Sequence, residues 1–400
     1  MTGFDFQRLR RFPDVEAPNL QAWDATDELL VQRAIDAGIA GDEIAIIGDE
    51  YGAIALALTD AGMRGIRVHQ DLITGRRALA ANARVLDLPV PAAHELDSSL
   101  LGRSRLVLLQ LPKGLAELEE ICDAVARWAA PDVALIAGGR VKHMALTQNE
   151  VLGRHFAEVQ AQRAERKSRL IVASGALPVA DQPPFPISRR HDGLTLSAYG
   201  AAFAGARLDI GTRVLIDVMS TLEPPAPVRA SAPFQPTDAR IGGIPAEFSG
   251  VVSAPPLRVV DLGCGTGALA VAFAQQHPDA VIAATDRSAS AARSAQATVV
   301  ANGLAARVTV TLDDAGSELP DGSADLVLLN PPFHLGTSVH EGAGHRLIQA
   351  AARLLRPGGE VWTVFNSHLD HRGVLSRDVG PTEQVARTPK FTVTRSARRG

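Results

Sequence analysis

A glycine-rich turn in the second half of the chain carries the strongest chemical signal in this sequence. Residues 259–270 read VVDLGCGTGALA, with Asp261 near the end of an apolar run and glycines at Gly263, Gly265 and Gly267 before an expected helix. Glycines allow a sharp turn and a close ligand, and the N-terminus of the helix offers free N–H groups. The spacing D-x-G-x-G-x-G differs from the G-x-G-x-x-G of dinucleotide sites. It suits the methionine end of S-adenosylmethionine, with Asp261 near the ammonium group.

Further acids follow at the ends of the next two expected strands. Asp286 lies 19 residues after Gly267, where a carboxylate can accept both ribose hydroxyls of an adenosine. Asp313 and Asp314 end the third strand, where one of them can contact the adenine amino group. The sequence does not distinguish between the two. Acids at successive strand ends after this turn predict a site for S-adenosylmethionine.

A second motif, Asn330-Pro331-Pro332-Phe333, closes the fourth expected strand, 69 residues after Asp261. An aromatic amine is a poor nucleophile because its lone pair is delocalised into the ring. Two acceptors that hold its N–H bonds can aim the lone pair at an electrophilic methyl group, and the Asn330 side-chain oxygen and the Pro331 carbonyl are the candidates. Phe333 can stack on a base taken out of its helix. We therefore assign the catalytic role to Asn330, Pro331 and Phe333.

Parallel α/β units must position these residues, because short β-rich runs alternate with helical stretches along most of the chain. A helix is expected over 288–303, and another ends at Pro357-Gly358-Gly359. The first half has expected strands at 43–50, 65–71, 105–112 and 132–139, and the second half has them at 257–263, 280–286, 307–314, 324–332 and 360–367.

The two halves resemble each other at a fixed spacing. Subtracting 215 takes Gly263 to Gly48, Gly267 to Gly52 and Asp286 to Asp71, which predicts a duplicated fold.

The first copy lacks the residues that a cofactor and an amine need. The same offset puts Ile46 in the place of Asp261 and Glu50 in the place of Gly265, and Leu111-Pro112-Lys113 replaces Asn-Pro-Pro. An isoleucine cannot hold an ammonium group, and no side-chain amide acceptor is left. We therefore expect this half to bind no cofactor, and to hold RNA or to act as a structural platform. Lys113 and Lys142 are its candidate phosphate contacts.

Composition and charge narrow the class of protein. The net charge is −4, yet residues 371–400 hold seven Arg or Lys against two acids, a local pattern that suits a partner with phosphates. No apolar run approaches the ~20 residues needed to span a bilayer, and no secretory signal is visible. Cys122 and Cys264 match no metal-ligand spacing. We expect a cytoplasmic protein with no metal and no membrane partner, and the sequence does not indicate its oligomeric state.

The expected organisation is an α/β chain of two tandem Rossmann-like domains. Residues 1–180 form the degenerate N-terminal domain, 181–195 a linker rich in proline and polar residues, and 196–400 the catalytic S-adenosylmethionine-dependent domain. The stretch from Glu223 to about Pro256, rich in Pro, Ala and Gly, is expected to be a long loop.

With these motifs in place, the chain resembles the class I methyltransferases of the N-P-P-[FYW] group, which modify exocyclic or amide nitrogens. Residues 207–219, 330–351, 358–375 and 385–398 are similar to bacterial ribosomal RNA guanine-N2 methyltransferases with two tandem domains. In that family the C-terminal domain is catalytic and the N-terminal domain is a degenerate copy. Two sister families modify small-subunit and large-subunit rRNA. Residues 20–32, 111–120, 138–145 and 165–170 resemble the large-subunit family.

Other functions are consistent with parts of the pattern. A small-subunit rRNA guanine-N2 methyltransferase would share the chemistry. A glutamine-amide methyltransferase of a protein release factor uses a similar Asn-Pro-Pro loop, but usually with Tyr after the prolines and a small helical N-terminal domain. A non-enzymatic RNA assembly factor is disfavoured by the intact Asp261, Asp286 and Asn330. A nicotinamide dehydrogenase would need a proton donor near the turn, and none is evident.

Overall fold

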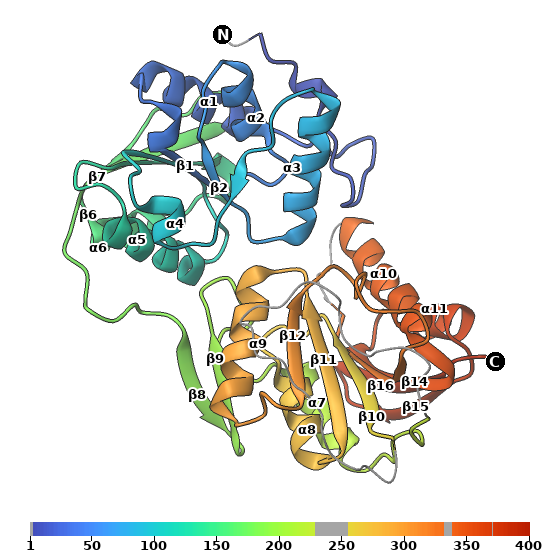
Figure 1. Cartoon of the computed structure of the whole chain (residues 1–400). Helices are drawn as coiled ribbons and strands as arrows, with labels where there is room; N and C mark the ends of the chain where they lie inside the picture. The colour runs from blue at the N-terminus through green and yellow to red at the C-terminus, as the bar shows by residue number, and fades with distance from the viewer. Residues whose placement is uncertain (1–2, 229–254, 332–337, 370) are drawn as a thin grey trace. The chain divides into compact units, whose positions relative to one another are not determined.

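The computed structural model of the chain describes residues 3–228, 255–331, 338–369 and 371–400, and it falls into two compact units, Met1–Phe185 and Pro186–Gly400 (Figure 1). Each unit has its own seven-stranded sheet with helices on both faces. This arrangement confirms the prediction of an α/β chain with two Rossmann-like domains.

The N-terminal unit alternates strands and helices as the sequence predicts. In addition to the four expected strands it has one short strand and an antiparallel pair at its end. Its described elements are α1 (Ala25–Ala37), β1 (Ile44–Ile47), α2 (Ala53–Asp60), β2 (Arg67–His69), α3 (Ile73–Val85), β3 (Ala92–Ala93), α4 (Ser98–Leu101), β4 (Leu106–Gln110), α5 (Leu115–Trp128), β5 (Ala134–Arg140), α6 (Leu146–His155), β6 (Phe156–Ala161) and β7 (Ser168–Ala176), with 3-10 helices at Phe6–Arg8, Gly41–Glu43 and Val141–His143.

The C-terminal unit begins with a hairpin and then follows the same order. Its described elements are β8 (Ile187–His191), β9 (Leu194–Ala198), α7 (Ile210–Met219), β10 (Leu257–Leu262), α8 (Ala268–Gln276), β11 (Ala280–Asp286), α9 (Ala289–Ala301), β12 (Val308–Leu312), β13 (Ala324–Leu329), α10 (Ser338–Leu354), β14 (Leu355–Asn366), α11 (His371–Asp378), β15 (Thr382–Arg387) and β16 (Phe391–Ala397). The helix expected to stop at Pro357 ends at Leu354.

The two sheets have the same topology. The strand orders are β3-β2-β1-β4-β5-β7-β6 and β12-β11-β10-β13-β14-β16-β15, and in each sheet the last two strands are antiparallel to their neighbours. Helix α2 begins at Ala53 and α8 at Ala268, which reproduces the offset of 215. Since the order, the direction and the spacing all agree, the structure supports the duplicated fold.

The C-terminal sheet is buried on both faces. Strand β10 is buried along its whole length. Its consecutive residues Val259 and Val260 belong to separate cores on opposite faces of the sheet. Helices α7, α8 and α9 pack on one face, and α10 and α11 pack on the other. A strand buried on both sides explains the continuous apolar run in the sequence.

The boundary between the two units, at Phe185 and Pro186, falls within residues 181–195, the segment expected to be a linker. Residues 181–195 contain the whole of β8 and the first two residues of β9, which pair as an antiparallel hairpin in the C-terminal unit. Leu194 and Leu196 are buried in the core, as alternate residues of a strand are. The prolines just before the hairpin led to the prediction of a linker instead. Most of the expected loop from Glu223 to Pro256 lies outside the described residues.

Strand β9 is fixed to α9 by side chains on the helix (Figure 1). The backbone N–H groups of alternate residues donate to a row of helix side chains four residues apart. The pairs are Thr195 to Asn302 at 3.1 Å, Ser197 to Thr298 at 2.9 Å and Tyr199 to Ser294 at 2.9 Å. These side chains replace a further strand along this edge of the hairpin.

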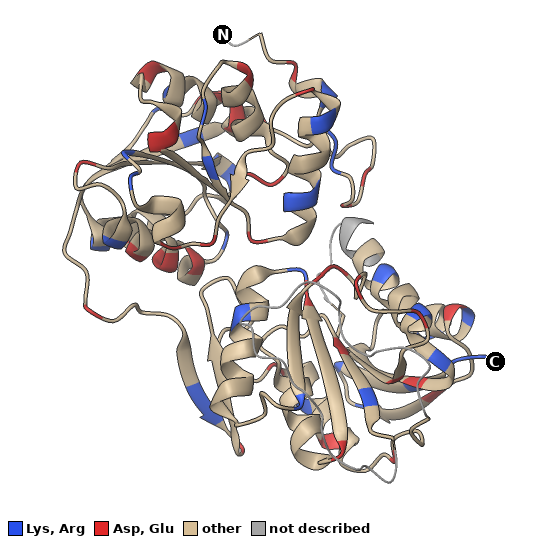
Figure 2. Cartoon of the chain, viewed as in Figure 1, with Lys and Arg blue, Asp and Glu red and all other residues tan. Residues whose placement is uncertain are grey.

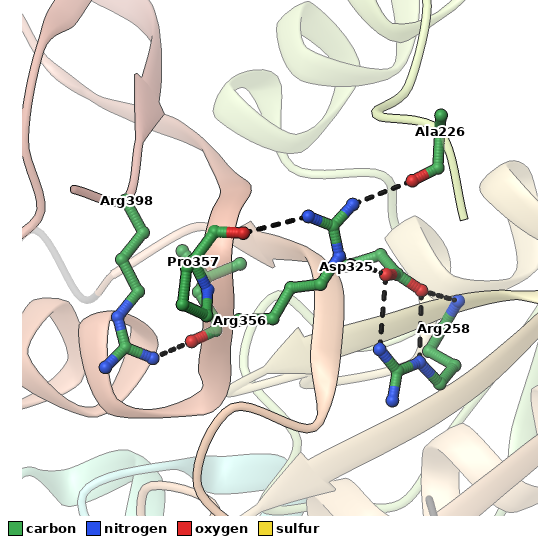
Figure 3. A network of polar contacts seen from close by, with 7 residues as sticks. Ala226, Arg258, Asp325, Arg356, Pro357 and Arg398 are labelled. Carbon is green, nitrogen blue, oxygen red and sulfur yellow. Dashed lines mark hydrogen bonds and ion pairs between the residues drawn. The ribbon is translucent and has the colours of Figure 1, made fainter. Parts of the chain in front are cut away.

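A buried carboxylate holds the beginnings of two central strands together (Figure 3). Asp325, near the start of β13, is fully buried and accepts from the backbone N–H of Arg258 at 2.9 Å and from its Nε at 3.1 Å. Arg356 Nε donates to the same carboxylate at 2.6 Å, and its Nη2 donates to the Ala226 carbonyl at 2.7 Å. The network lies at the amino ends of the strands, so it is remote from their carboxyl ends.

Candidate active site

The predicted site residues meet at the carboxyl ends of four adjacent strands. Asp261 lies one residue before the end of β10, Asp286 is the last residue of β11, Asp313 and Asp314 follow β12, and Asn330 follows β13. These strands are parallel neighbours in the order β12-β11-β10-β13. In an open α/β sheet this edge is where ligands bind.

Part of the second motif lies outside the described residues. Pro331 is described and buried, whereas Pro332 and Phe333 fall in the range 332–337. The stacking role assigned to Phe333 therefore stays a prediction.

The three glycines of the turn serve two different purposes. All have positive φ, +76° at Gly263, +55° at Gly265 and +77° at Gly267. A Cβ at Gly265 would meet no described atom within 4 Å, and one at Gly263 would meet only Leu347, at 3.9 Å. At Gly267 it would lie 3.1 Å from Ala295 in α9. The first two glycines leave a cradle against the backbone, and the third lets two helices pack closely.

The N–H groups of the turn are largely used within the protein, which differs from the expectation of a free helix N-terminus. Gly263 and Cys264 both donate to the Thr285 carbonyl at 2.9 Å. Ala270, in the first turn of α8, donates to Asp261 Oδ2 at 3.0 Å. A ligand in this cradle would therefore lie against glycine Cα atoms and the acidic side chains around the turn.

Asp261 is a buried carboxyl group with an altered acidity. Its side chain is 1% exposed, and burial raises its pKa to about 7, with a smaller contribution from the charge of Asp286. The hydrogen bond from Ala270 acts in the opposite direction. Removal from water disfavours the charged form of an acid, and a nearby cation restores it. The position therefore suits a ligand that brings a positive charge.

Asp286 joins the glycine turn to the loop after β11. Its Oδ2 accepts from the Gly265 N–H at 2.9 Å, and its Oδ1 accepts from the Ser288 N–H at 2.9 Å. A carboxylate accepts several hydrogen bonds at once, which is the property that a contact with ribose hydroxyls requires. The geometry is compatible with the ribose role expected from the sequence.

Asp313 and Asp314 have different partners in the structure. Asp313 is 1% exposed, and it accepts from Ser317 Oγ at 2.5 Å and from the Glu318 N–H at 2.9 Å, so both oxygens hold the following turn. The Asp314 Oδ2 atom forms an ion pair with Arg346 from α10. Asp313 has a structural role in its own loop, which leaves Asp314 as the better candidate for ligand contact.

The side-chain amide of Asn330 is held on one side only. Its Nδ2 donates to Thr212 Oγ1 at 2.9 Å and lies 3.5 Å from Asp209 Oδ2. Its Oδ1 is buried and accepts no hydrogen bond from any described residue. A buried acceptor without a partner costs about 1–3 kcal/mol. It is therefore a place where a donor from a ligand would fit.

Sequence reasoning missed Asp209 and Thr212 as site residues. Asp209 is the N-cap residue of α7, and Thr212 is the third residue of the helix. The Asp209 carboxylate accepts from the Thr212 N–H at 3.2 Å. The signal was present as D-x-x-T before an apolar helix, which is a typical N-terminal cap. Contact with Asn330 spans more than 115 residues of sequence, so no local pattern reveals it.

The corresponding turn of the N-terminal unit also has a carboxylate that accepts from the first turn of the helix, but at a different sequence position. Ile46 lies in the place of Asp261, and Asp49 accepts from the Ala55 N–H at 2.8 Å, just as Asp261 accepts from Ala270. Burial raises the pKa of Asp49 to about 6. Helix α2 therefore retains an acidic partner for its first turn, but the acid comes from the loop and not from the strand.

The chain's own N-terminal segment contacts this turn. Tyr51 donates through its hydroxyl to Asp14 at 3.0 Å, and the Arg11 guanidinium lies 4.6 Å from the centre of the Tyr51 ring. Asn82 donates to the carbonyls of Arg10 and Tyr51, both at 2.9 Å. Protein groups thus contact this turn where the C-terminal unit leaves a cradle beside Gly265.

Several basic residues of the C-terminal tail are engaged inside the protein. Arg395 pairs with Glu360, Arg377 pairs with Asp378, and Arg398 donates to the Leu355 carbonyl. Among the described residues, the remaining basic residues of the tail are exposed and have no ion pair, and they are Arg372, Arg387, Lys390 and Arg399. Of these, Arg399 donates to the carbonyl of Ser376 at 2.9 Å. Figure 2 shows basic residues on β8 as well, where Arg189 and Arg190 are exposed.

None of the helices in the described ranges is both long and apolar enough to cross a membrane. Within the same ranges, no three His, Cys, Asp or Glu side chains are grouped in a way that would hold a metal ion.

Sequence models of two families match the chain. The RLMG N-terminal domain matches residues 1–176, and the Methyltransferase small domain matches residues 248–395. The two matches fall in different structural units. The second one includes the glycine turn and the residues around Asn330.

Relatives match over nearly the full length. A protein of Ectopseudomonas mendocina (strain ymp) named Ribosomal RNA large subunit methyltransferase G is 33% identical over 404 residues, covering 99% of each chain. One of the same name from Streptomyces griseus is 32% identical and covers 98% of this chain and 97% of the relative. The T. thermophilus 16S rRNA N2 G1207 methyltransferase, solved with AdoMet and guanosine, has a TM-score of 0.70 at 19% identity, covering 98% of this chain and 99% of that one, so the fold is shared.

Proposed function

Since the chain belongs to the family of the Ribosomal RNA large subunit methyltransferase G proteins, we propose that it transfers a methyl group from S-adenosylmethionine to the exocyclic N2 of a guanine in large-subunit rRNA. The family agrees with the resemblance noted in the sequence, including the choice of the large-subunit branch. The observation that carries the chemistry is the buried Oδ1 of Asn330, which accepts a hydrogen bond from no residue that the structure describes.

The donor site that we propose consists of the turn and the acids around it. Gly263 and Gly265 leave the space against the backbone, and Gly267 brings α9 close. Asp261 would face the ammonium group and Asp286 the ribose hydroxyls. When bound, S-adenosylmethionine supplies an electrophilic methyl group on a sulfonium centre.

For the adenine contact we propose Asp314. Both Asp313 oxygens hold the turn that follows, through Ser317 and Glu318, whereas Asp314 is bound through Oδ2 to Arg346. An adenine amino group needs one acceptor, which the Asp314 Oδ1 would supply.

The acceptor site that we propose holds the guanine amine by its two N–H bonds. One donates to Asn330 Oδ1 and the other to the Pro331 carbonyl, which directs the nitrogen lone pair toward the donor site. A strong base is not required, because the amine becomes acidic once it is methylated. Phe333 would stack on the base.

We propose residues 196–400, together with the hairpin residues that precede them in the same unit, as the catalytic domain, and residues 1–180 as a degenerate domain that binds no cofactor. Ile46 replaces the acid of the strand, and Tyr51 and its partners contact the turn. This half would help to hold RNA, with Lys113 and Lys142 exposed for phosphate contact. We place the protein in the cytoplasm with its rRNA substrate.

The proposal is tested by methyl transfer from labelled S-adenosylmethionine to rRNA from cells that lack this gene. We expect N2-methylguanosine at one position of the large-subunit RNA. Asn330→Ala should abolish transfer while S-adenosylmethionine still binds, and Asn19→Ala, the same change at an exposed position, should leave the rate unchanged. Label in small-subunit RNA alone would overturn the substrate, and normal turnover of Asn330→Ala would overturn the acceptor site.

A further inference from the structure

The first turn of α7 contacts the acceptor side chain from outside the Asn-Pro-Pro motif. Thr212 Oγ1 lies 2.9 Å from Asn330 Nδ2, and Asp209 Oδ2 lies 3.5 Å from the same nitrogen. Asp209 also caps the helix by accepting from the Thr212 N–H. The two contacts reach Asn330 from a segment about 120 residues earlier in the chain.

The contacts with Asp209 and Thr212 determine the orientation of the Asn330 side-chain amide. An amide has a donor end and an acceptor end of nearly the same shape, and its neighbours decide its orientation. An ionised carboxylate only accepts hydrogen bonds, so Asp209 excludes Oδ1 from its side and attracts Nδ2. A hydroxyl accepts or donates, so Thr212 alone would tolerate either orientation. Asp209 therefore sets the orientation and Thr212 supplies the shorter bond.

From this arrangement we propose that Asp209 and Thr212 are positioning residues, which hold the Asn330 amide with Oδ1 toward the guanine amine. The inference rests on the proposed function. In the opposite orientation Nδ2 would face the amine, so two donors would meet and the amine would lose one of its two acceptors. The buried Oδ1, for which the described part of the chain supplies no donor, is the end that the pair leaves available.

The cap and the positioning role can be separated by substitution. Asparagine caps a helix about as well as aspartate, so Asp209→Asn keeps the start of α7 while removing the group that only accepts. Its new amide can donate to Asn330 Oδ1 and so permits the wrong orientation. Thr212→Val keeps the shape and removes the acceptor oxygen, and Thr212→Ser keeps that oxygen.

The test measures kcat, the KM for RNA, the affinity for S-adenosylmethionine and the thermal midpoint for each variant. We expect Asp209→Asn and Thr212→Val to lower kcat by roughly 10- to 100-fold, in the range of one lost hydrogen bond to a charged or reacting group. The cofactor affinity should stay within about twofold, and Thr212→Ser should restore most of kcat.

The outcomes separate this inference from the function on which it rests. If the wild type methylates guanine, Asn330→Ala is inactive, and both Asp209→Asn and Thr212→Val keep the wild-type kcat, the positioning role is wrong and the proposed function stands. If the wild type transfers no methyl group to rRNA, the proposed function itself fails. Equal losses in Thr212→Ser and Thr212→Val would also overturn the role of the hydroxyl.

Discussion

Replacing Asp261 with asparagine should stabilise the C-terminal unit at neutral pH and weaken cofactor binding. Burial raises the pKa of this carboxyl from about 3.8 to about 7. Between these two values the folded state keeps a proton that the unfolded chain has released, so the free energy of unfolding falls as the pH rises. Asparagine is neutral throughout and has an oxygen that can accept from Ala270.

The size of the effect follows from the difference in pKa. A shift of about three units corresponds to about 4 kcal/mol, at 1.36 kcal/mol per unit. The gain from Asp261→Asn, relative to the wild type, should therefore be small near pH 4, grow through pH 5 and 6, and level off at about 4 kcal/mol above pH 7. A cost of the new amide that does not depend on pH shifts this difference equally at every pH, so it leaves the change of about 4 kcal/mol between pH 4 and pH 7 unaltered.

The assay is urea unfolding of both proteins, without cofactor, from pH 4 to pH 8. Trp362 is fully buried and is the one tryptophan between residues 186 and 400, so its fluorescence reports the C-terminal unit in a background with Trp23→Phe and Trp128→Phe. A stability difference that is flat across this range would refute the assignment of the raised pKa to Asp261.

Cofactor binding supplies an independent readout of the same group. If a ligand ammonium restores the ionised form, about one proton should be released per cofactor bound at pH 6 and almost none at pH 8.5. Calorimetry in two buffers of different ionisation enthalpy measures that number. Asp261→Asn should abolish the release and weaken binding by roughly 10- to 100-fold. The matched control is Asp49→Asn in the degenerate copy, which should leave both quantities unchanged.

Two further predictions concern stability and RNA binding. Asp325→Ala should destabilise the C-terminal unit by about 3–5 kcal/mol in urea unfolding at pH 7, because it leaves the buried Arg258 and the partly buried Arg356 without their partner. Burial acts to raise the pKa of Asp325, but the hydrogen bonds from these arginines outweigh it and hold the pKa below its ordinary value, so this stability should be lost only as the pH falls through that lowered pKa. RNA affinity should fall steeply with salt, and Arg387→Glu with Lys390→Glu should reduce the slope of log affinity against log salt by about two; an unchanged slope would contradict a phosphate contact by these residues.

Much of this fold could be predicted because its signals are local. The nine strands expected in the two halves are all present, since apolar runs followed by glycine or acidic residues mark buried strands directly. The positions of Asp261, Asp286 and Asn330 on one sheet edge follow from parallel topology alone. The family indicated by the resemblance is confirmed by relatives that match nearly the whole chain.

What the sequence could not show depends on contacts between distant segments. The contact of α7 with Asn330 joins residues more than 115 positions apart, and the choice between Asp313 and Asp314 depends on which carboxylate the next turn uses. Asp49 is another example. In the sequence, Ile46 in the place of Asp261 indicates that the first copy has lost its acid, whereas in the structure Asp49 from the next loop accepts from the Ala55 N–H instead. The hairpin of β8 and β9 was hidden by the prolines before it.

The three hydrogen bonds between β9 and α9 restrict the number of residues that the strand segment can have. Four residues of helix advance about 6 Å and two residues of strand advance about 6.8 Å, so the two repeats remain matched over three consecutive bonds. A substitution at Ser294, Thr298 or Asn302 removes one bond and leaves the other two. Inserting or deleting one residue within β9 shifts every later N–H to the opposite side of the strand. The contact between β9 and α9 should therefore tolerate a substitution at one of these three positions better than a change in the length of β9.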